Sequence, residues 1–265
     1  MHINTIPSLM NPTTTPPNGP NSETTLQAEI DIKSTPILRA IVFDLDNTLV
    51  DFMAMKRQAV DAAIDAMIDA GLAMDPQGVR DRINLIYDEE GIEYQKVFDR
   101  LLIDLLGEVD HKVLAAGVVA YRRAREAALK PYPHVSATLM ELVKSGVRLA
   151  ILRDAPIREA WLRLSYIGFS HLFDHVVTFD DTGRYKPDPK PFRYVLDLLG
   201  VEPEEALMVG DRLERDIAGA SALGMRTAFA RYGDVTGGDV EADYVLDDIK
   251  QLLGIVLKER QEVHA

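Results

Sequence analysis

The sequence predicts an α/β protein: a doubly wound parallel sheet with an inserted all-helical cap domain. From residue 147 onward, short and nearly continuous apolar segments alternate with amphipathic ones, as expected for strands that helices cover on both faces. A similar apolar segment at residues 37–45 comes first, but the block 53–130 separates it from the others and follows a helical period throughout. The cap is therefore expected between the first and second strands.

Before the first strand, residues 1–35 are rich in Pro, Thr, Asn and Ser and show no apolar periodicity. Such a segment cannot bury enough apolar surface to offset the entropy lost on ordering, so a disordered tail is expected. It has neither the basic nor the apolar region of a secretory signal. No apolar run in the chain approaches the roughly 18 residues that suggest a membrane span.

The inserted block is predicted to hold four helices. Between Met53 and Leu72, apolar residues such as Val60, Ile64 and Met67 recur on one face, while charged residues fall on the other. The same pattern returns at residues 79–87, 94–106 and 113–129. We therefore expect the cap to span residues 52–131 and the α/β core to comprise residues 36–51 and 132–265.

The core segments follow in alternation. Strands are predicted at residues 147–152, 175–179, 206–210, 226–230 and 243–246, and helices at 136–144, 156–167, 189–199 and 213–223. A glycine follows each of these helices, which suits a helix C-cap because glycine adopts the left-handed conformation without strain. In a sheet of this kind, ligands bind beyond the carboxyl ends of the strands, so those ends are the place to seek a site.

Composition limits the partners of the protein. The 265 residues carry 29 basic and 42 acidic side chains, a formal net charge of −13, which disfavours nucleic acid and anionic membranes as partners. The absence of cysteine excludes disulfides, thiolate catalysis and cysteine-based zinc sites, and it fits a cytoplasmic protein. The sequence leaves a homodimer open.

Polar residues that follow four of the predicted strands supply the candidate site: Asp44, Asp46, Arg153, Asp154, Lys186, Asp211 and Asp216. Parallel strands bring these residues to one edge of the sheet although they are far apart in the sequence. Several carboxylates at one point repel one another unless a cation lies among them. Because Mg²⁺ prefers oxygen ligands and often bridges to phosphate, the residue types predict a magnesium site for phosphoryl chemistry.

Individual roles follow from the chemistry of each group. Asp44 is a candidate metal ligand and nucleophile, since a carboxylate can attack phosphorus to give an aspartyl-phosphate. Asp46, two residues on, is placed to protonate the leaving oxygen and then to activate water. The turn that contains Asn47 and Thr48 offers backbone N–H groups that could cradle the phosphate. Lys186 would neutralise charge around the nucleophile and the transferring group.

Three segments carry a resemblance to a known family. FDLDNTLVD, KPDPKPF and MVGDRLERDIAGASALGM are similar to three motifs of the haloacid dehalogenase (HAD) superfamily, in the expected order, over roughly residues 37–255. The resemblance implies a Rossmann-like core, Mg²⁺ as cofactor, and hydrolysis of the phosphomonoester of a small soluble metabolite. The helical block after the first motif matches the cap of one subclass.

The resemblance also implies residue roles. It makes Asp44 the nucleophile, Asp46 the general acid/base whose backbone carbonyl binds the metal, and Lys186 the motif lysine. Asp211 resembles the metal-binding carboxylate, and Asp216 the second acidic residue of that motif, which supports metal or lysine. Family members that act as haloacid dehalogenases typically lack a carboxylate at the position of Asp46, so its presence favours phosphate chemistry.

The segment LAILRDAP departs from the family pattern. It places Arg153, followed by Asp154, where the family usually has Thr or Ser. In one reading Arg153 binds phosphate through its planar fork, and Asp154 beside it belongs to the same phosphate-binding set. In the other reading Arg153 is too large for the slot, pairs with a neighbouring carboxylate and crowds the phosphate. We expect activity to be retained, with a dehalogenase-type hydrolase and a non-catalytic phosphate-binding protein as the alternatives. In the cap, Glu93, Tyr94 and Lys96 are candidates for substrate contact, or else ordinary surface residues.

Overall fold

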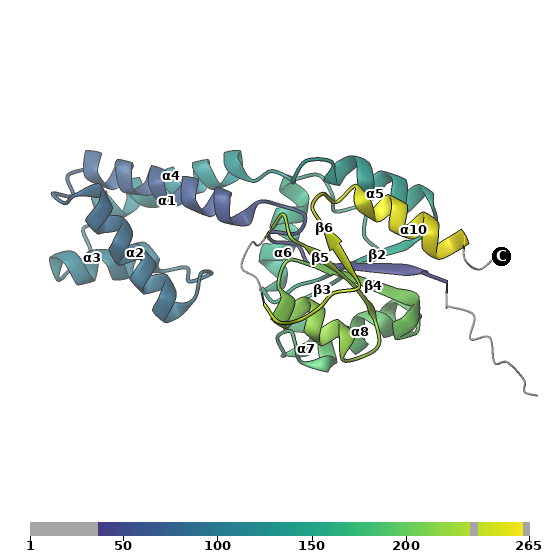
Figure 1. Ribbon diagram of the computed structural model, residues 1–265. Helices are drawn as coiled ribbons and strands as arrows, with labels where there is room; N and C mark the ends of the chain where they lie inside the picture. The colour runs from purple at the N-terminus through teal and green to yellow at the C-terminus, as the bar shows by residue number, and fades with distance from the viewer. Residues whose placement is uncertain (1–36, 234–237, 262–265) are drawn as a thin grey trace, which may run out of the picture. The chain divides into compact units, whose positions relative to one another are not determined.

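The computed structural model describes residues 37–233 and 238–261, which form a six-stranded parallel sheet with helices on both faces and a helical insertion (Figure 1). The predicted disordered tail, residues 1–35, lies outside the described residues. The strands are β1 (Ala40–Phe43), β2 (Arg148–Leu152), β3 (His175–Val177), β4 (Ala206–Gly210), β5 (Arg226–Ala230) and β6 (Tyr244–Leu246). The predicted α/β fold is confirmed.

The strand order explains where a ligand can bind. The order is β3-β2-β1-β4-β5-β6, so the chain winds outward in one direction from β1 and in the other from β4. The crevice between two such halves is the usual ligand site of an open parallel sheet. The register pairs Phe43 of β1 with Ile151 of β2 and with Val209 of β4, which brings the residues after these three strands to one edge.

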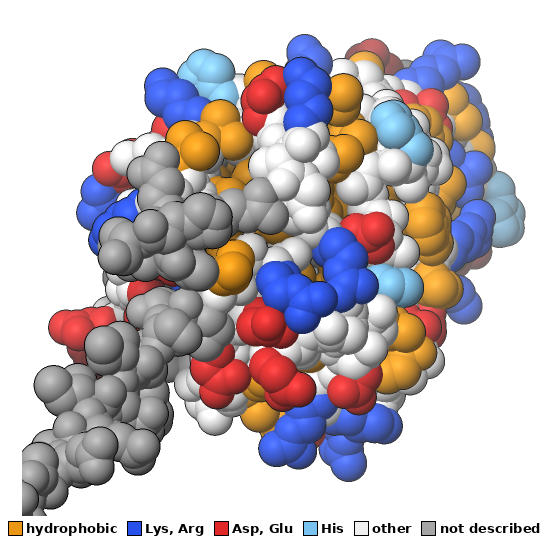
Figure 2. All heavy atoms as spheres, turned by 90° about the vertical axis from the view of Figure 1, so that its right-hand side faces the viewer, with side chains coloured by type: hydrophobic (Ala, Val, Ile, Leu, Met, Phe, Trp, Pro, Cys, Tyr) orange, Lys and Arg blue, Asp and Glu red, His pale blue; other side chains and the backbone are white. Residues whose placement is uncertain are grey.

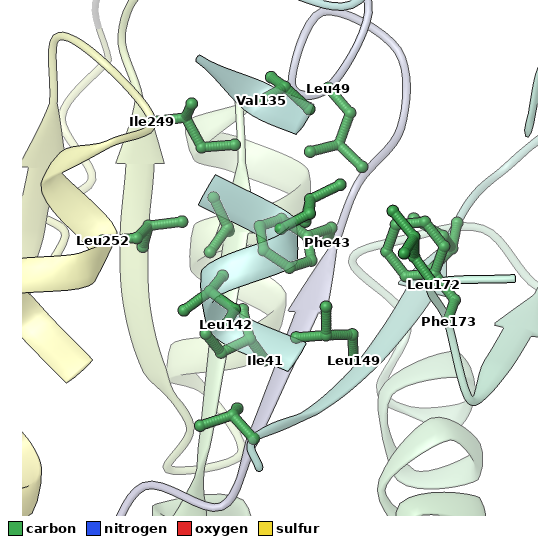
Figure 3. Close-up of a cluster of buried hydrophobic side chains, with 14 of the residues drawn as sticks. Ile41, Phe43, Leu49, Val135, Leu142, Leu149, Leu172, Phe173, Ile249 and Leu252 are labelled. Atoms are coloured by element: carbon green, nitrogen blue, oxygen red, sulfur yellow. The ribbon is translucent and has the colours of Figure 1, made fainter. Parts of the chain in front are cut away.

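Both faces of the sheet are buried, which accounts for the almost continuous apolar strands in the sequence. On one face, Ile41 and Phe43 pack against residues of α5 (Val135–Lys144) and α10 (Gln251–Gln261), as Figure 3 shows. On the other face, Val42 packs in the cluster that includes residues of α8 (Pro189–Leu199). The helix α10 was not among the predicted elements.

Two predicted core elements differ in the structure. The strand predicted to end at residue 179 stops at Val177, since Asp181 accepts from the N–H and the hydroxyl of Thr178 and caps the short helix α7 (Phe179–Thr182). The helix predicted at 213–223 is a π-type turn, η2 (Leu213–Ile217), followed by α9 (Ala218–Ser221). The remaining core elements are α6 (Ile157–Tyr166) and the short η1 (Pro203–Glu205).

Four helices form the insertion, as predicted: α1 (Phe52–Asp69), α2 (Pro76–Glu90), α3 (Val97–Leu106) and α4 (His111–Ala128). Aspartate side chains accept N–H bonds at the start of three of them, at Asp51, Asp75 and Asp110. The apolar faces of the four helices meet in a hydrophobic cluster of their own, separate from the two clusters on the sheet. The insertion therefore has its own core.

The chain leaves and re-enters the sheet domain at one place. Val50 forms an antiparallel bridge with Pro131, and the N–H of Asp51 donates to the carbonyl of Lys130 at 3.3 Å. The helices α1 and α4, which flank this crossing, pack closely: a Cβ added at Gly117 would lie 2.7 Å from Cγ of Met67. These contacts fit the predicted cap limits of residues 52–131, which stay a prediction.

The surface and the helices add two observations. On the face of the described core drawn in Figure 2, basic and acidic side chains are interspersed with scattered hydrophobic ones, without a continuous basic stripe. Across the described residues, every helix is too short or too polar to cross a membrane.

Candidate active site

The carboxylate of Asp44 lies directly after β1, at the carboxyl edge of the sheet, and the backbone N–H of Asp44 donates to the carbonyl of Val209 in β4. Its residue is only 4% exposed, and its Oδ1 accepts from Nζ of Lys186 at 2.6 Å. Burial on its own would raise the pKa of Asp44, but the positive charges of Lys186, Arg215 and Arg153 hold the pKa below its usual value. Asp44 is therefore held as a carboxylate, the form that can act as a nucleophile.

Lys186 is the buried counterion of this site. Besides Asp44, its ammonium lies 2.7 Å from Oδ1 of Asp216 and donates to the carbonyl of Leu152 at 3.0 Å. Burial would lower the pKa of Lys186, but the charges of Asp216 and Asp44 raise it above its usual value. Asp154 accepts from the backbone N–H of Lys186 at 2.9 Å and so fixes the loop that carries the lysine.

Three buried aspartates surround one point. Oxygen atoms of Asp44, Asp211 and Asp216 all lie within 4.8 Å of one another. Burial, together with the charges of Asp44 and Asp216, raises the pKa of Asp211 to about 8. The ammonium of Lys186 neutralises only part of this negative charge, and a divalent cation with oxygen ligands would neutralise the rest. The donor set therefore fits Mg²⁺.

Backbone features hold these aspartates in place. Asp216 lies in the π-type turn η2, and its Oδ2 accepts from the N–H of Arg212 at 3.0 Å. Gly210, the last residue of β4, makes room for it, because a Cβ there would lie 2.4 Å from the Asp216 side chain. The hydroxyl of Thr48 lies 3.5 Å from Oδ1 of Asp211. Motif glycine and motif aspartate are thus packed as a unit.

Arg153 does not pair with Asp44 or Asp211 but with Asp46. Its Nη2 donates to Oδ2 of Asp46 at 2.5 Å and to Oε1 of Glu93 from the insertion at 3.0 Å. Arg163 of α6 joins the same network, with Nε 3.2 Å from Oδ1 of Asp46 and Nη2 2.7 Å from Glu93 Oε1. Both arginines are almost fully buried, and Nε and Nη1 of Arg153 have no partner.

The other predicted phosphate-binding residues form hydrogen bonds or ion pairs within the protein. Asp154 engages Lys186 through Oδ1, while its Oδ2 lies 3.3 Å from Nη1 of Arg215. Asn47 has a positive φ of 55°, and its Oδ1 accepts from the N–H of Met53 at the start of α1. The Thr48 carbonyl accepts from the Tyr232 hydroxyl at 2.8 Å. Their contacts with phosphate stay predictions, and these bonds assign Asp154 to positioning Lys186.

A cavity of about 530 Å³ lies beside this network, between the insertion and α6. Of the three cap candidates named from the sequence, Glu93 and Tyr94 line this cavity and Lys96 is not among its lining residues. Sequence reasoning missed several other lining residues, among them Tyr87 and the two buried basic residues Lys56 and Arg163. Each of these basic residues lies on the buried, otherwise apolar face of its helix. A charged residue within an apolar stripe is the sequence signal that could have identified them.

The comparisons with known proteins agree with this geometry. Residues 38–224 match the family model described as haloacid dehalogenase-like hydrolase. A glyceraldehyde 3-phosphate phosphatase of Methanocaldococcus jannaschii is 35% identical over 223 residues, which cover 83% of this chain and 97% of that protein. The protein of the same name from Pyrococcus furiosus is 36% identical over 235 residues, covering 86% of this chain and 98% of that one.

Among solved structures, a HAD phosphatase from Thermococcus onnurineus superposes with a TM-score of 0.63 at 28% sequence identity, over 84% of this chain and 99% of that chain. The similarity therefore extends over both the sheet and the helical insertion.

Proposed function

The chain belongs to the haloacid dehalogenase-like hydrolase family, and we propose that Asp44 is the nucleophile with which it hydrolyses phosphate monoesters. One observation carries the proposal: a buried, ionised Asp44 has Nζ of Lys186 2.6 Å from one oxygen and lies within an otherwise under-neutralised aspartate cluster. A lysine at that distance offsets the charge that would otherwise repel an anionic ester.

In the proposed mechanism, the phosphorus atom undergoes two successive displacements. An oxygen of Asp44 bonds to phosphorus while the ester bond breaks, and Asp46 gives its proton to the departing alkoxide. Water then attacks the same phosphorus, passes its proton to Asp46, and releases phosphate with the Asp44 carboxylate restored. Lys186 offsets the negative charge of Asp44, which is the nucleophile in the first step and the leaving group in the second.

We infer that Mg²⁺ is the cofactor, held by Asp44 and Asp211, with the Asp46 carbonyl and Asp216 as the further predicted contacts. When bound, Mg²⁺ supplies the positive charge that stabilises a phosphoryl group during transfer. Asp216, which is paired with Lys186, supports this site through the lysine.

Arg153 is assigned to the substrate phosphate. Its Nε and Nη1 are buried donors without a partner, and phosphate oxygens are the acceptors that a guanidinium fork suits best. Asp46 can act as an acid only when one of its oxygens reaches the leaving group, so a guanidinium must release it. We propose that Arg153 turns from Asp46 to the phosphate when the ester binds.

The substrate is a small phosphorylated metabolite, and we propose glyceraldehyde 3-phosphate as the first candidate because two relatives carry that name. The cytoplasmic location and the homodimer stay predictions. Light scattering in solution would test the homodimer. A non-catalytic phosphate-binding protein is the competing function, and the Arg153–Asp46 pair is the observation in its favour.

Phosphate release from a panel of sugar phosphates, nucleotides, glyceraldehyde 3-phosphate and p-nitrophenyl phosphate, with and without Mg²⁺, tests the proposal. We expect Mg²⁺-dependent release that Asp44→Asn abolishes. Activity that persists in Asp44→Asn contradicts the assigned nucleophile. Phosphate binding without release of phosphate from any ester identifies the non-catalytic protein, and release of halide from a haloacid in place of phosphate identifies a dehalogenase.

A further inference from the structure

In the cavity beside the active site, most carboxylates are already paired, whereas some hydrogen-bond donors have no acceptor among the residues that the structure describes. Three of the four carboxylates that line it are engaged: Glu93 by Arg153 and Arg163, Glu126 by the Tyr166 hydroxyl at 2.8 Å, and Glu159 by Arg125 at 3.6 Å. Its acceptors are thus largely taken by groups of the protein itself.

Lys56 of α1 is a buried cation of the cavity wall that no carboxylate in the described part of the chain pairs with. It is 6% exposed, and its Nζ donates to the backbone carbonyl of Ile92 at 2.9 Å. The ammonium lies 4.3 Å from the ring centroid of Tyr87 and 5.4 Å from that of Tyr121. Among the described residues, no carboxylate lies within ion-pair distance of it. Burial lowers the pKa of Lys56 to about 8, as expected for an ammonium without a close counterion.

Two further hydrogen-bond donors of the cavity wall have no acceptor within residues 37–233 and 238–261. The hydroxyl of Tyr87 is buried and has no partner, and neither has Nη1 of Arg163. A buried donor left unpaired costs about 1–3 kcal/mol of free energy, so such groups mark places where a ligand supplies the missing acceptor.

The cavity and the phosphate site are linked by contacts. Glu93 lines the cavity and also contacts Arg153, which in turn contacts Asp46. The loop that carries Glu93 also supplies the Ile92 carbonyl to Lys56. An ester whose phosphate lies at Asp44 therefore has its carbon skeleton directed to this cavity.

We propose that Lys56 and Tyr87 determine substrate specificity by binding a carbonyl oxygen at the end of the substrate remote from its phosphate. The inference rests on the proposed function and names the substrate class: short-chain phosphate esters that carry an aldehyde or a carboxylate. A carbonyl oxygen accepts hydrogen bonds from both donors without contributing a proton of its own. An amine would meet a like charge at Lys56, and an alkyl end would leave the Tyr87 hydroxyl unpaired and offer no acceptor to Lys56.

Paired substrates test the proposal. Glyceraldehyde 3-phosphate and 2-phosphoglycolate present the carbonyl group, and glycerol 3-phosphate replaces the aldehyde by an alcohol. The variants are Lys56→Met, which keeps an apolar stem against the tyrosine rings, and Tyr87→Phe. Lys112→Met is the matched control, because Lys112 is an exposed cap lysine that does not line the cavity.

We expect Lys56→Met to lower the ratio of kcat/KM for the carbonyl ester to that for glycerol 3-phosphate by about 10–100-fold, as loss of a charged hydrogen bond does, and mainly through KM. Tyr87→Phe should lower the same ratio by about 3–10-fold. Comparison of the aldehyde with the carboxylate shows which carbonyl the site prefers. An unchanged ratio in both variants overturns the proposal.

Binding gives a readout that does not depend on turnover. In the Asp44→Asn background, calorimetric dissociation constants for the same esters should favour the carbonyl compounds, and Lys56→Met should remove that preference. If no ester is hydrolysed yet this preference appears and is lost with Lys56, the proposed function fails and the specificity inference stands. If hydrolysis occurs and neither preference responds to Lys56, the inference fails and the function stands.

Discussion

The guanidinium of Arg153 uses only Nη2, which Asp46 and Glu93 share, while Nε and Nη1 are buried and unpaired. We expect Arg153→Thr to weaken inhibition by inorganic phosphate at least about tenfold, since it removes a charge-assisted hydrogen bond. The measurement is the inhibition constant for phosphate. Arg148→Thr, at the opposite end of the same strand, is the matched control. Tighter phosphate binding or faster hydrolysis in Arg153→Thr would mean that the arginine blocks the site.

Lys56 should also reduce the stability of the folded protein at neutral pH. Its pKa in the folded state is about 8, below the ordinary lysine value of 10.5, mainly because the side chain is buried. Between these two pH values the unfolded chain binds more protons, so this lysine's contribution to stability rises with pH there; below about pH 8 its penalty is complete.

The unfolding free energies of native protein and Lys56→Met test this expectation. The native protein should gain about 1–3 kcal/mol of unfolding free energy relative to the variant between pH 7 and pH 10, because only the native protein has a lysine at position 56 to deprotonate. Denaturant unfolding at several pH values measures the difference, and Lys112→Met should show no such trend. If the difference in unfolding free energy does not change with pH, the pKa of Lys56 is not lowered in the folded protein.

At the scale of single elements, the junction of β4 and η2 is the least tolerant part of the site. A Cβ at Gly210 would lie 2.4 Å from the Asp216 side chain, which in turn contacts Lys186. We expect Gly210→Ala to displace Asp216, to lower kcat by at least about 100-fold and to cost 1–3 kcal/mol or more in stability. Activity assays and denaturant unfolding would show this.

Gly254→Ala in α10 is the control for that substitution, because no atom lies within 4 Å of the added Cβ. A helical Gly→Ala change of this kind should raise stability by up to about 1 kcal/mol and leave kcat unchanged. If Gly210→Ala behaves in the same way, the close packing between β4 and Asp216 is not essential.

The elements themselves were largely predictable from the sequence. All six strands lie within the predicted segments, and for β2 to β6 both ends fall within two residues of the predicted ones. These segments are predictable because burial sets the alternation of apolar runs and amphipathic stretches. The helix predicted at 213–223 begins as a π-type turn, in which the N–H groups of Ile217 and Ala218 donate to carbonyls five residues earlier, and continues as a short α-helix. The apolar pattern of one turn does not distinguish hydrogen bonds to the fifth preceding residue from bonds to the fourth.

The candidate site was predictable only in part. Asp44, Lys186, Asp211 and Asp216 meet as expected, because they follow parallel strands or adjoining loops at one edge of the sheet. Asp46 pairs with Arg153 and with Arg163. The sequence allowed Arg153 to pair with a neighbouring carboxylate, but it gave no indication that Arg163 joins the site. Which face of α6 or α1 meets the active site depends on how the helices pack, and one sequence does not specify that packing.

At the scale of the whole molecule, Mg²⁺ should stabilise the fold. Asp44, Asp211 and Asp216 repel one another in the folded state, and a cation that binds only the folded protein raises the unfolding free energy by about 3 kcal/mol at one hundred times its Kd. Thermal unfolding with and without Mg²⁺ measures the effect. Asp211→Asn should be at least as stable as the native protein without Mg²⁺ and should lose the Mg²⁺ response.

The exposed Asp197→Asn change of α8 provides the control, since it alters the net charge equally and lies outside the aspartate cluster. It should retain the full Mg²⁺ response. An equal loss of response in both variants would show that Mg²⁺ acts through the overall charge of the protein and not through a site.

The bridge between Val50 and Pro131 has a consequence for how such a protein can change over evolutionary time. Because the insertion begins and ends at one hydrogen-bonded point and has its own hydrophobic core, one set of four helices can be replaced by another without altering the strands. The groups that we propose to break the phosphate bond lie at the sheet edge, whereas Lys56 and Tyr87 lie in the insertion. Reaction and substrate preference can thus be inherited separately, so that new metabolites become accessible to an unchanged chemical apparatus.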